Sequence, residues 1–244
     1  MLSEKPWRIE TVLQFCAGIF ACFFLGMTVS GVLQKIGVNG FKNPGDFGNI
    51  LLGTLSFQGA TCGLILFFLR QHGINWRDAF GFRDPKLKSS LGWSVALLVL
   101  FIAPAAWWWQ EISAQILTQL GWPVEDQAAV TMFKGVKAWG EYAYLTFFAV
   151  VLAPVAEEFI FRGMLYPFVK QLGFPKLAMF GTSLLFALIH ADKAIFIPLF
   201  VLALALTWLY EKTDTLLAPI GAHALFNAAN LVVLSIAQNV PPTK

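Results

Sequence analysis

The chain has 244 residues, of which 57% are hydrophobic and only 13% are charged, whereas soluble domains carry about 25% charged residues. So few charged side chains cannot cover a water-facing surface, which excludes an ordinary soluble domain and favours a membrane protein. The net charge of +3 gives no reason to expect a nucleic-acid partner, because membrane proteins place basic residues according to their topology.

Long apolar stretches recur along the chain and predict transmembrane helices. A helix needs about 20 apolar residues to cross the ~30 Å hydrocarbon core of a bilayer. We predict about seven spans, in chain order at residues 11–33, 47–69, 89–110, 142–169, 177–191, 194–210 and 215–238. The expected fold class is all-α, a polytopic bundle of transmembrane helices with interfacial helices. Because we find no linker, we expect residues 1–244 to form a single integral membrane domain.

Charged residues in the loops predict the orientation of the chain. The loop after the second span holds more basic than acidic residues, namely Arg70, Arg77, Arg83, Lys86 and Lys88 against Asp78 and Asp84. An excess of Lys and Arg marks a cytoplasmic loop, and Lys5 and Arg8 agree with a cytoplasmic N-terminus. Residues 111–141 are acidic and are expected outside, as interfacial helix and loop. The expected location is a bacterial cytoplasmic membrane.

The fourth predicted span contains a charged cluster, Glu157, Glu158 and Arg162. A charge at membrane depth costs several kcal/mol unless it is paired or hydrated. Glu158 and Arg162 are four residues apart, so they share a helix face and are expected to neutralise each other. Glu157 points about 140° away from Arg162 at ~100° per residue. It is therefore the carboxylate left over, which suits a general base.

Two of the three histidines also lie in predicted spans. His190 follows Phe186 by four residues, and Asn227 follows His223 by four, so each pair shares one helix face. Polar groups in lipid face one another or a shared aqueous cavity, so we expect both histidines to meet Glu157.

This set of residues is compatible with two kinds of chemistry. A carboxylate and a histidine can activate water while a second histidine and an amide stabilise an oxyanion. Alternatively, Glu157, His190 and His223 could hold zinc with one position open to water. The sequence contains no His-Glu-x-x-His motif and no serine in a Gly-x-Ser-x-Gly turn, which speaks against the common zinc proteases and serine hydrolases.

Two prolines and one turn sequence predict local breaks in the helices. Pro154 and Pro167 lie inside the fourth span, and each removes a backbone N–H from the helix. We expect them to bend the helix and free backbone carbonyls, as is seen near functional cavities, although a bend without function is the alternative. Residues 81–85, Gly-Phe-Arg-Asp-Pro, predict a turn at the membrane surface.

The charged and aromatic pattern resembles that of the CPBP intramembrane proteases, which include the CAAX prenyl endopeptidases and the bacterial abortive-infection proteins. The family pattern is Glu-Glu-x-x-x-Arg, then Phe-x-x-x-His, then His-x-x-x-Asn or Asp, on separate helices. Here it reads as Glu157-Glu158 with Arg162, Phe186 with His190, and His223 with Asn227. The resemblance covers residues 149–238, within a CPBP-like catalytic half of about 140–240.

The resemblance implies an intramembrane endopeptidase with four catalytic residues. Glu157 and His190 would activate the attacking water, and His223 with Asn227 would stabilise the oxyanion. The family has been described both as metalloproteases and as metal-independent glutamate proteases. Zinc is therefore an open cofactor, with Glu157, His190 and His223 as its candidate ligands.

The same resemblance implies a supporting role for three residues and a class of partner. Glu158 and Arg162 would hold the shape of the site, with Phe186 packed against it. The expected partner, besides the lipid bilayer, is a peptide or protein at the membrane, CAAX-like and prenylated or leader-bearing, cut near the cytoplasmic side. The sequence predicts no particular oligomeric state.

Two functions from other classes stay open. One is a catalytically silent membrane scaffold or bacteriocin-immunity protein with the same fold, against which the unpaired Glu157 argues. The other is a small proton-coupled transporter, since intramembrane Glu and His residues also relay protons. The absence of an internal sequence repeat argues against this second alternative.

Overall fold

The computed structural model describes residues 2–43, 45–82, 92, 95–96, 103–121, 128–136 and 138–239. These residues form helices, turns and loops without a strand, which confirms the all-α prediction. Five helices in the described ranges are long and apolar enough to cross a membrane, namely Ile9–Lys35, Phe47–Gln71, Trp139–Gln171, Phe196–Thr213 and Leu217–Ile236. They correspond to five predicted spans, and a sixth corresponds to the shorter apolar helix Pro175–Ile189. Half of the predicted span at 89–110 lies outside the described residues.

The chain divides into two compact units. One unit is Lys5–Ala79, and the other combines Met1–Glu4 with Phe80–Lys244. The organisation of residues 1–244 as a single membrane domain stays a prediction.

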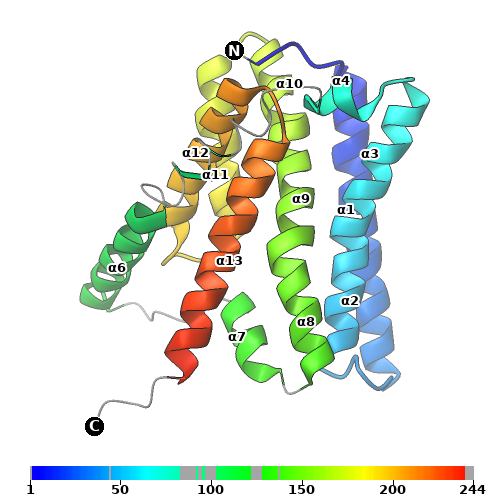
Figure 1. Cartoon of the computed structure of the whole chain (residues 1–244). Helices are drawn as coiled ribbons and strands as arrows, with labels where there is room; N and C mark the ends of the chain where they lie inside the picture. The colour runs from blue at the N-terminus through cyan, green and yellow to red at the C-terminus, as the bar shows by residue number, and fades with distance from the viewer. Residues whose placement is uncertain are drawn as a thin grey trace. The chain divides into compact units, whose positions relative to one another are not determined.

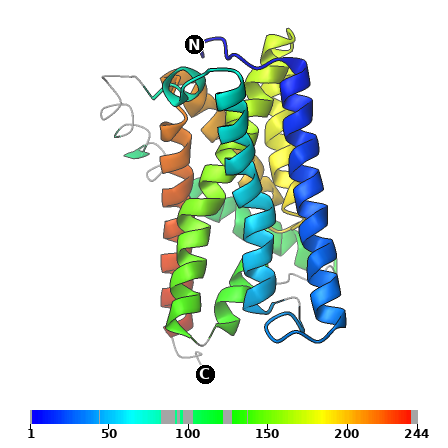
Figure 2. The same cartoon turned by 90° about the vertical axis from the view of Figure 1, so that its right-hand side faces the viewer.

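The unit Lys5–Ala79 is built on two long antiparallel rods (Figures 1 and 2). The first rod is α1 (Ile9–Lys35), and it packs along a second rod made of α2 (Phe47–Thr54), the π-helical segment η1 (Leu55–Gly59) and α3 (Ala60–Gln71). The chain then enters the short helix α4 (Trp76–Phe80).

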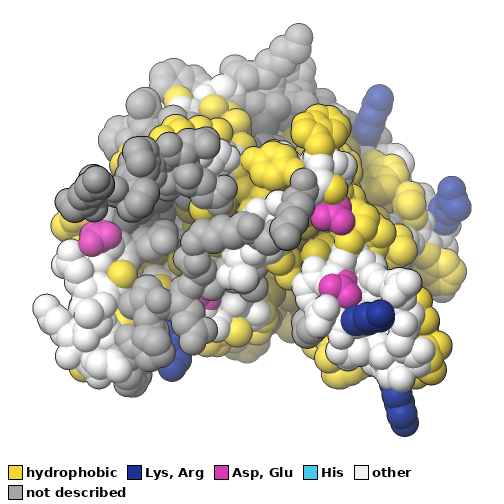
Figure 3. Space-filling view, turned by 90° about the horizontal axis from the view of Figure 1, so that it is seen from below, with side chains coloured by type: hydrophobic (Ala, Val, Ile, Leu, Met, Phe, Trp, Pro, Cys, Tyr) yellow, Lys and Arg dark blue, Asp and Glu magenta, His cyan; other side chains and the backbone are white. Residues whose placement is uncertain are grey.

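Small residues let the two rods of this unit approach closely. A Cβ atom placed on Gly26 of α1 would lie 2.5 Å from the Ser56 Cβ, so only glycine fits at this crossing. Large apolar side chains of α1, such as Phe20, Phe24 and Leu25, are exposed. Figure 3, a view from below, shows hydrophobic side chains at the surface together with scattered charged ones.

In the other unit, a single rod of 33 residues carries the charged cluster. It consists of α8 (Trp139–Phe147), η3 (Phe148–Leu152), α9 (Ala153–Glu158), η4 (Phe159–Leu165) and α10 (Tyr166–Gln171). The helix α13 (Leu217–Asn239) packs along its η3 and α9 segments (Figures 1 and 2).

The two π-helical segments of this rod each end just before a proline. The N–H of Ala153 donates to the Phe148 carbonyl and the N–H of Tyr166 donates to the Phe161 carbonyl, five residues back in both cases. Pro154 and Pro167 come next and have no N–H to donate, so the helix widens where its regular bonding is interrupted.

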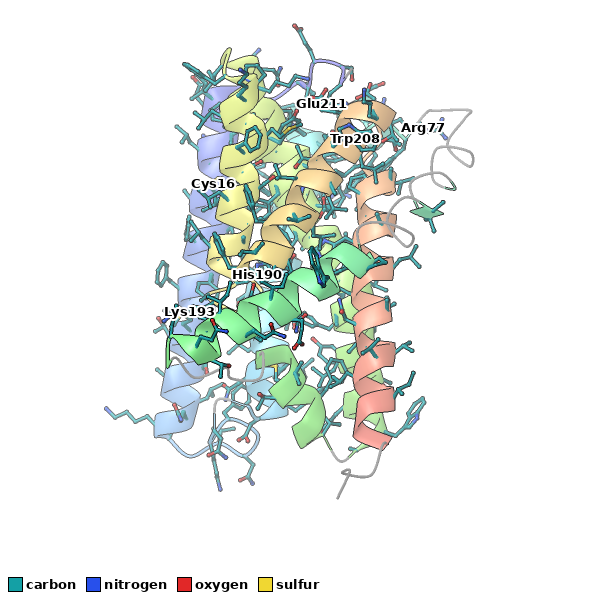
Figure 4. The ribbon with its side chains drawn as sticks, turned by 90° about the vertical axis from the view of Figure 1, so that its left-hand side faces the viewer. Cys16, Arg77, His190, Lys193, Trp208 and Glu211 are labelled. Carbon is teal, nitrogen blue, oxygen red and sulfur yellow. The ribbon has the colours of Figure 1, made fainter. Side chains whose placement is uncertain are left out.

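The helices α11 (Pro175–Ile189) and α12 (Phe196–Thr213) form a hairpin that is shorter than its neighbours. At 1.5 Å per residue they are about 22 and 27 Å long, against about 35 Å for α13. Their turn therefore lies part-way along α13, with His190 and Lys193 at this level (Figure 4). The turn contains Ala191 at a φ of 51°.

Two further helices lie at the level of this turn and below it. The helix α6 (Ala103–Gln119) packs across α12, and α7 (Ala128–Gly135) follows it (Figures 1 and 4). The predicted third span was expected to end at residue 110, but α6 continues to Gln119. A hydrogen bond from Gln115 Nε2 to Glu111 Oε1, at 3.1 Å, supports the helix beyond the expected end.

The N-terminal residues attach to the end of α12. The Leu2 N–H donates to Glu211 Oε2 at 3.3 Å, and the Ser3 hydroxyl donates to Asp214 Oδ1 at 2.9 Å. Glu211 also accepts from the Tyr166 hydroxyl at 2.5 Å and pairs with Lys170. The ends of α10 and α12 and the N-terminal residues therefore lie together.

Candidate active site

A fully buried ion pair forms the base of the site. Arg162 Nη1 donates to Glu158 Oε1 at 2.8 Å, and the two side chains are 1% and 0% exposed, which confirms the predicted pairing. Arg162 also donates from Nη2 to the Ala203 carbonyl at 2.9 Å and from Nε to Thr207 Oγ1 at 3.4 Å. Both acceptors belong to α12 and were not predicted. In the sequence, this contact was indicated only by the hydroxyl of Thr207, which lies inside an otherwise apolar predicted span.

Glu158 has a second partner that the sequence did not reveal. His223 Nδ1 lies 2.9 Å from Glu158 Oε1, the same oxygen that accepts from Arg162. A carboxylate bound to a guanidinium can only accept, so Nδ1 of His223 carries the hydrogen. The other ring nitrogen, Nε2, lies 3.8 Å from Glu157 Oε2. Glu158 therefore orients His223 toward Glu157.

His190 is oriented by the backbone of its own helix. Its Nδ1 lies 2.7 Å from the Phe186 carbonyl, which accepts only, so Nδ1 is the donor and Nε2 is available as an acceptor. We expected His190 inside a span, but it stands at the C-terminal end of α11 and is exposed at the hairpin turn (Figure 4). The helix ends there because Ala191 adopts a left-handed conformation.

The buried ring of Phe186 connects the ion pair with both histidines. Its centroid lies 4.8 Å from that of His190 and 5.8 Å from that of His223. The Arg162 guanidinium carbon lies 4.9 Å from the same centroid, within cation–π range. The predicted packing of Phe186 on His190 is confirmed, and the contact with His223 adds α13 to the cluster.

Glu157 stands beside Glu158 but has different neighbours. Its side chain is 15% exposed, and it faces Nε2 of His223 while His190 also interacts with it electrostatically. Glu157 and His223 therefore face each other from α9 and α13, and His190 is connected to His223 through the ring of Phe186. Their chemical roles stay predictions.

Asn227 reaches the rod one helical turn beyond His223. Its Nδ2 donates to the Ala149 carbonyl in η3 at 2.8 Å. The resemblance assigned Asn227 to an oxyanion, and this bond to the backbone was not predicted.

The predicted zinc ligands are of a suitable chemical type, but they are not arranged to hold the metal. Two imidazole Nε2 atoms and a carboxylate are typical zinc ligands, and the bonded Nδ1 atoms are typical of their second shell. Among the residues that the structure describes, however, no group of three His, Cys, Asp or Glu side chains is arranged to hold a metal ion. We therefore derive no chemical step through a metal.

The C-terminal part of the chain matches one family. Residues 139–229 match the family model described as Rce1-like, type II CAAX prenyl endopeptidase Rce1-like. The matched segment runs from the start of α8 into α13 and includes all of the predicted site residues. This confirms the resemblance to the CPBP proteases and supports a protease. No curated protein and no solved structure matches the chain.

Proposed function

We propose that this chain is an intramembrane endopeptidase in which Glu157 activates water, and the match of residues 139–229 to the Rce1-like family model supports this proposal. The observation that best supports this proposal is that the two adjacent glutamates differ in burial and in their partners. Glu158 is fully buried and paired with Arg162, whereas Glu157 is partly exposed and faces the imidazole of His223. A carboxylate in this position can take up a proton and release it again.

The proposed step is a water attack on a peptide bond. Glu157 removes a proton from water, and the oxygen forms a bond to the scissile carbonyl carbon while the carbonyl electron pair moves to its oxygen. When that pair returns, the carbon–nitrogen bond breaks and Glu157 gives its proton to the leaving amine. His190 Nε2 accepts a hydrogen bond from the same water and orients it.

His223 is the proposed donor to the oxyanion. Because its Nδ1 already donates to Glu158, an N–H on Nε2 requires the imidazolium form. In that form Nε2 donates to the negative oxygen, and the preorganised donor stabilises the developing charge. Asn227, which the resemblance pairs with His223, donates to the Ala149 carbonyl.

The proposed substrate is a peptide held at the membrane. The site lies at the level of the α11–α12 turn, within the apolar helices, so a substrate anchored in lipid reaches it without leaving the bilayer. A prenylated CAAX-like peptide and a leader-bearing peptide both meet this requirement.

The proposal is tested by cleavage in liposomes that contain the purified protein and either a farnesylated CAAX peptide or a membrane-inserted leader peptide. We expect Glu157→Gln to lower kcat by about 10²–10⁴-fold, the usual contribution of a general base. The matched control is Glu141→Gln, which lies on the same rod in the first turn of α8 and should leave kcat unchanged. Full activity of Glu157→Gln would contradict the assignment of the base.

The same preparation decides the role of metal. We expect cleavage to persist after dialysis against a strong chelator, with metal content measured on the dialysed protein. Loss of cleavage that added zinc restores would instead make Glu157, His190 and His223 metal ligands.

A further inference from the structure

The carbonyl of Ala149 is a backbone acceptor whose helical donors are both unavailable. In a helix it would accept from residue 153 in α-helical register or from residue 154 in π-helical register. The N–H of Ala153 is committed to the Phe148 carbonyl, and residue 154 is proline. The Ala149 carbonyl is therefore left for a donor from outside the rod.

Asn227 supplies that donor from a helix that is distant in sequence. Its Nδ2 lies 2.8 Å from the Ala149 oxygen, across a sequence separation of 78 residues. Asparagine is suited to this position because its amide resembles the missing peptide N–H in donor chemistry. In lipid, where water does not satisfy a free carbonyl, such a replacement is favoured.

On α13 this bond lies one helical turn from His223, and on the rod Ala149 lies eight residues, about two helical turns, before Glu157. Glu157 follows Pro154 by three residues, and His223 precedes Asn227 by four on the same face of α13. The 3.8 Å separation of Glu157 Oε2 and His223 Nε2 depends on how α13 is placed along η3 and α9. A bond that fixes α13 at Ala149 therefore fixes this separation.

We propose that Asn227 is a positioning residue, whose side-chain amide replaces the N–H missing at Pro154 and thereby sets His223 against Glu157. Its catalytic consequence rests on the proposed function, whereas the structural bond does not. Asn227 acts through the backbone of η3, by the hydrogen bond from its Nδ2 to the Ala149 carbonyl.

The test is a double-mutant cycle between Asn227→Ala and Pro154→Ala, measured as kcat and KM in the liposome assay. Alanine at residue 154 returns a backbone N–H to the rod and is a good helix former, so this variant is expected to fold. Asn227→Ala alone should lower kcat by about 100-fold, the loss that a displacement of ~1 Å produces. In the Pro154→Ala background the same change should cost no more than about twofold.

The same double-mutant cycle can be measured by thermal unfolding in detergent, which does not require activity. It compares the unmodified protein, the two single variants and the double variant. Asn227→Ala should lower Tm by about 2–4 °C when residue 154 is proline, the shift expected from one hydrogen bond in a chain of this size. It should not lower Tm when residue 154 is alanine. The matched control is Asn230→Ala, whose Nδ2 donates to the Phe226 carbonyl within α13 and which should shift Tm equally in both backgrounds.

Equal losses from Asn227→Ala in both backgrounds would overturn the inference. An equal loss in kcat would make Asn227 a direct donor to the oxyanion, and an equal shift in Tm would show that its bond is independent of Pro154. If Glu157→Gln leaves cleavage intact, the proposed function fails, while the thermal cycle still decides the role of Asn227.

Discussion

Arg162 is the side chain of the site with the most partners. It is buried, it donates to Glu158 on its own rod and to Ala203 and Thr207 on α12, and it lies beside the Phe186 ring. A guanidinium in this position is stable only because its donors are matched by acceptors in a fixed geometry. Through Glu158 it also holds the acceptor that orients His223.

Removing this charge should destabilise the protein strongly. Arg162→Met keeps most of the side-chain length but leaves Glu158 buried without a counter-charge, and we expect a loss of about 3–5 kcal/mol in the free energy of unfolding. Denaturant titration in detergent micelles measures it. The control is Lys170→Met, which breaks the more exposed pair with Glu211 and should cost about 1 kcal/mol or less. Similar losses for the two variants would contradict the structural role given to Arg162.

Residue spacing predicted contacts within one helix and missed those between helices. The pairs Glu158–Arg162 and Phe186–His190 followed from a separation of four residues. The bond from His223 to Glu158 joins residues 65 apart in sequence, and no local pattern indicates which of two adjacent glutamates a distant histidine will reach.

At the scale of elements, the turn that follows α4, in the unit that contains Phe80–Lys244, depends on Gly81. This glycine has a φ of 74°, and a Cβ atom there would lie 1.7 Å from the Asp214 carbonyl oxygen. The neighbouring Phe80 carbonyl accepts from the Leu216 N–H at 2.9 Å, so this segment is fixed against the connection between α12 and α13. Of the predicted turn at residues 81–85, the part beyond residue 82 lies outside the described residues.

A pair of glycine substitutions separates backbone strain from steric conflict at this turn. Gly73 also has a positive φ, 64°, but open space around its Cα, so Gly73→Ala should cost only the left-handed strain of about 1–2 kcal/mol. Gly81→Ala adds a clash with backbone, for which a further ~1–3 kcal/mol is expected. Tm measured in detergent compares the two variants. Equal shifts would mean that the approach of Gly81 to Asp214 is not tight.

The hairpin of α11 and α12 gives His190 its place at membrane depth. Apolar content predicted two spans here, at residues 177–191 and 194–210, and the structure has α11 at Pro175–Ile189 and α12 at Phe196–Thr213, so the α11 helix has only 15 residues. A helix this short ends inside a ~30 Å hydrocarbon core when its other end is at the surface. The polar turn that follows therefore brings His190 to the level of Glu157 and His223.

At the scale of the whole molecule, different parts of the chain lie at the two ends of the unit that combines Met1–Glu4 with Phe80–Lys244. Leu2 and Ser3 bind Glu211 and Asp214 at the end of α12, where α13 begins. α13 then runs about 35 Å away from them, which exceeds the hydrocarbon thickness (Figure 1). The N-terminal residues and the end of α13 therefore lie on opposite sides of a membrane that α13 crosses.

Reporter fusions test this topology. We expect a reporter fused before Leu2 to be active only as a cytoplasmic form, and one fused after Asn239 to be active only as an exported form, because basic loops favour a cytoplasmic N-terminus. An insertion at Gly173, in the turn between α10 and α11 on the N-terminal side, is the internal control and should behave like the N-terminal fusion. Both termini reporting from the same side would exclude a single crossing by α13. The bacterial origin of the membrane stays a prediction.

The sequence by itself determined the membrane environment, the helical class and the residues of the candidate site, because charge is costly in lipid and helical periodicity relates residues three or four apart. Only the tertiary structure decided the partners of those residues. It assigned His223 to Glu158, Arg162 to α12 and Asn227 to the carbonyl freed at Pro154. These bonds depend on the register of helices against one another, which is set by packing across the whole unit and is not encoded in any local spacing.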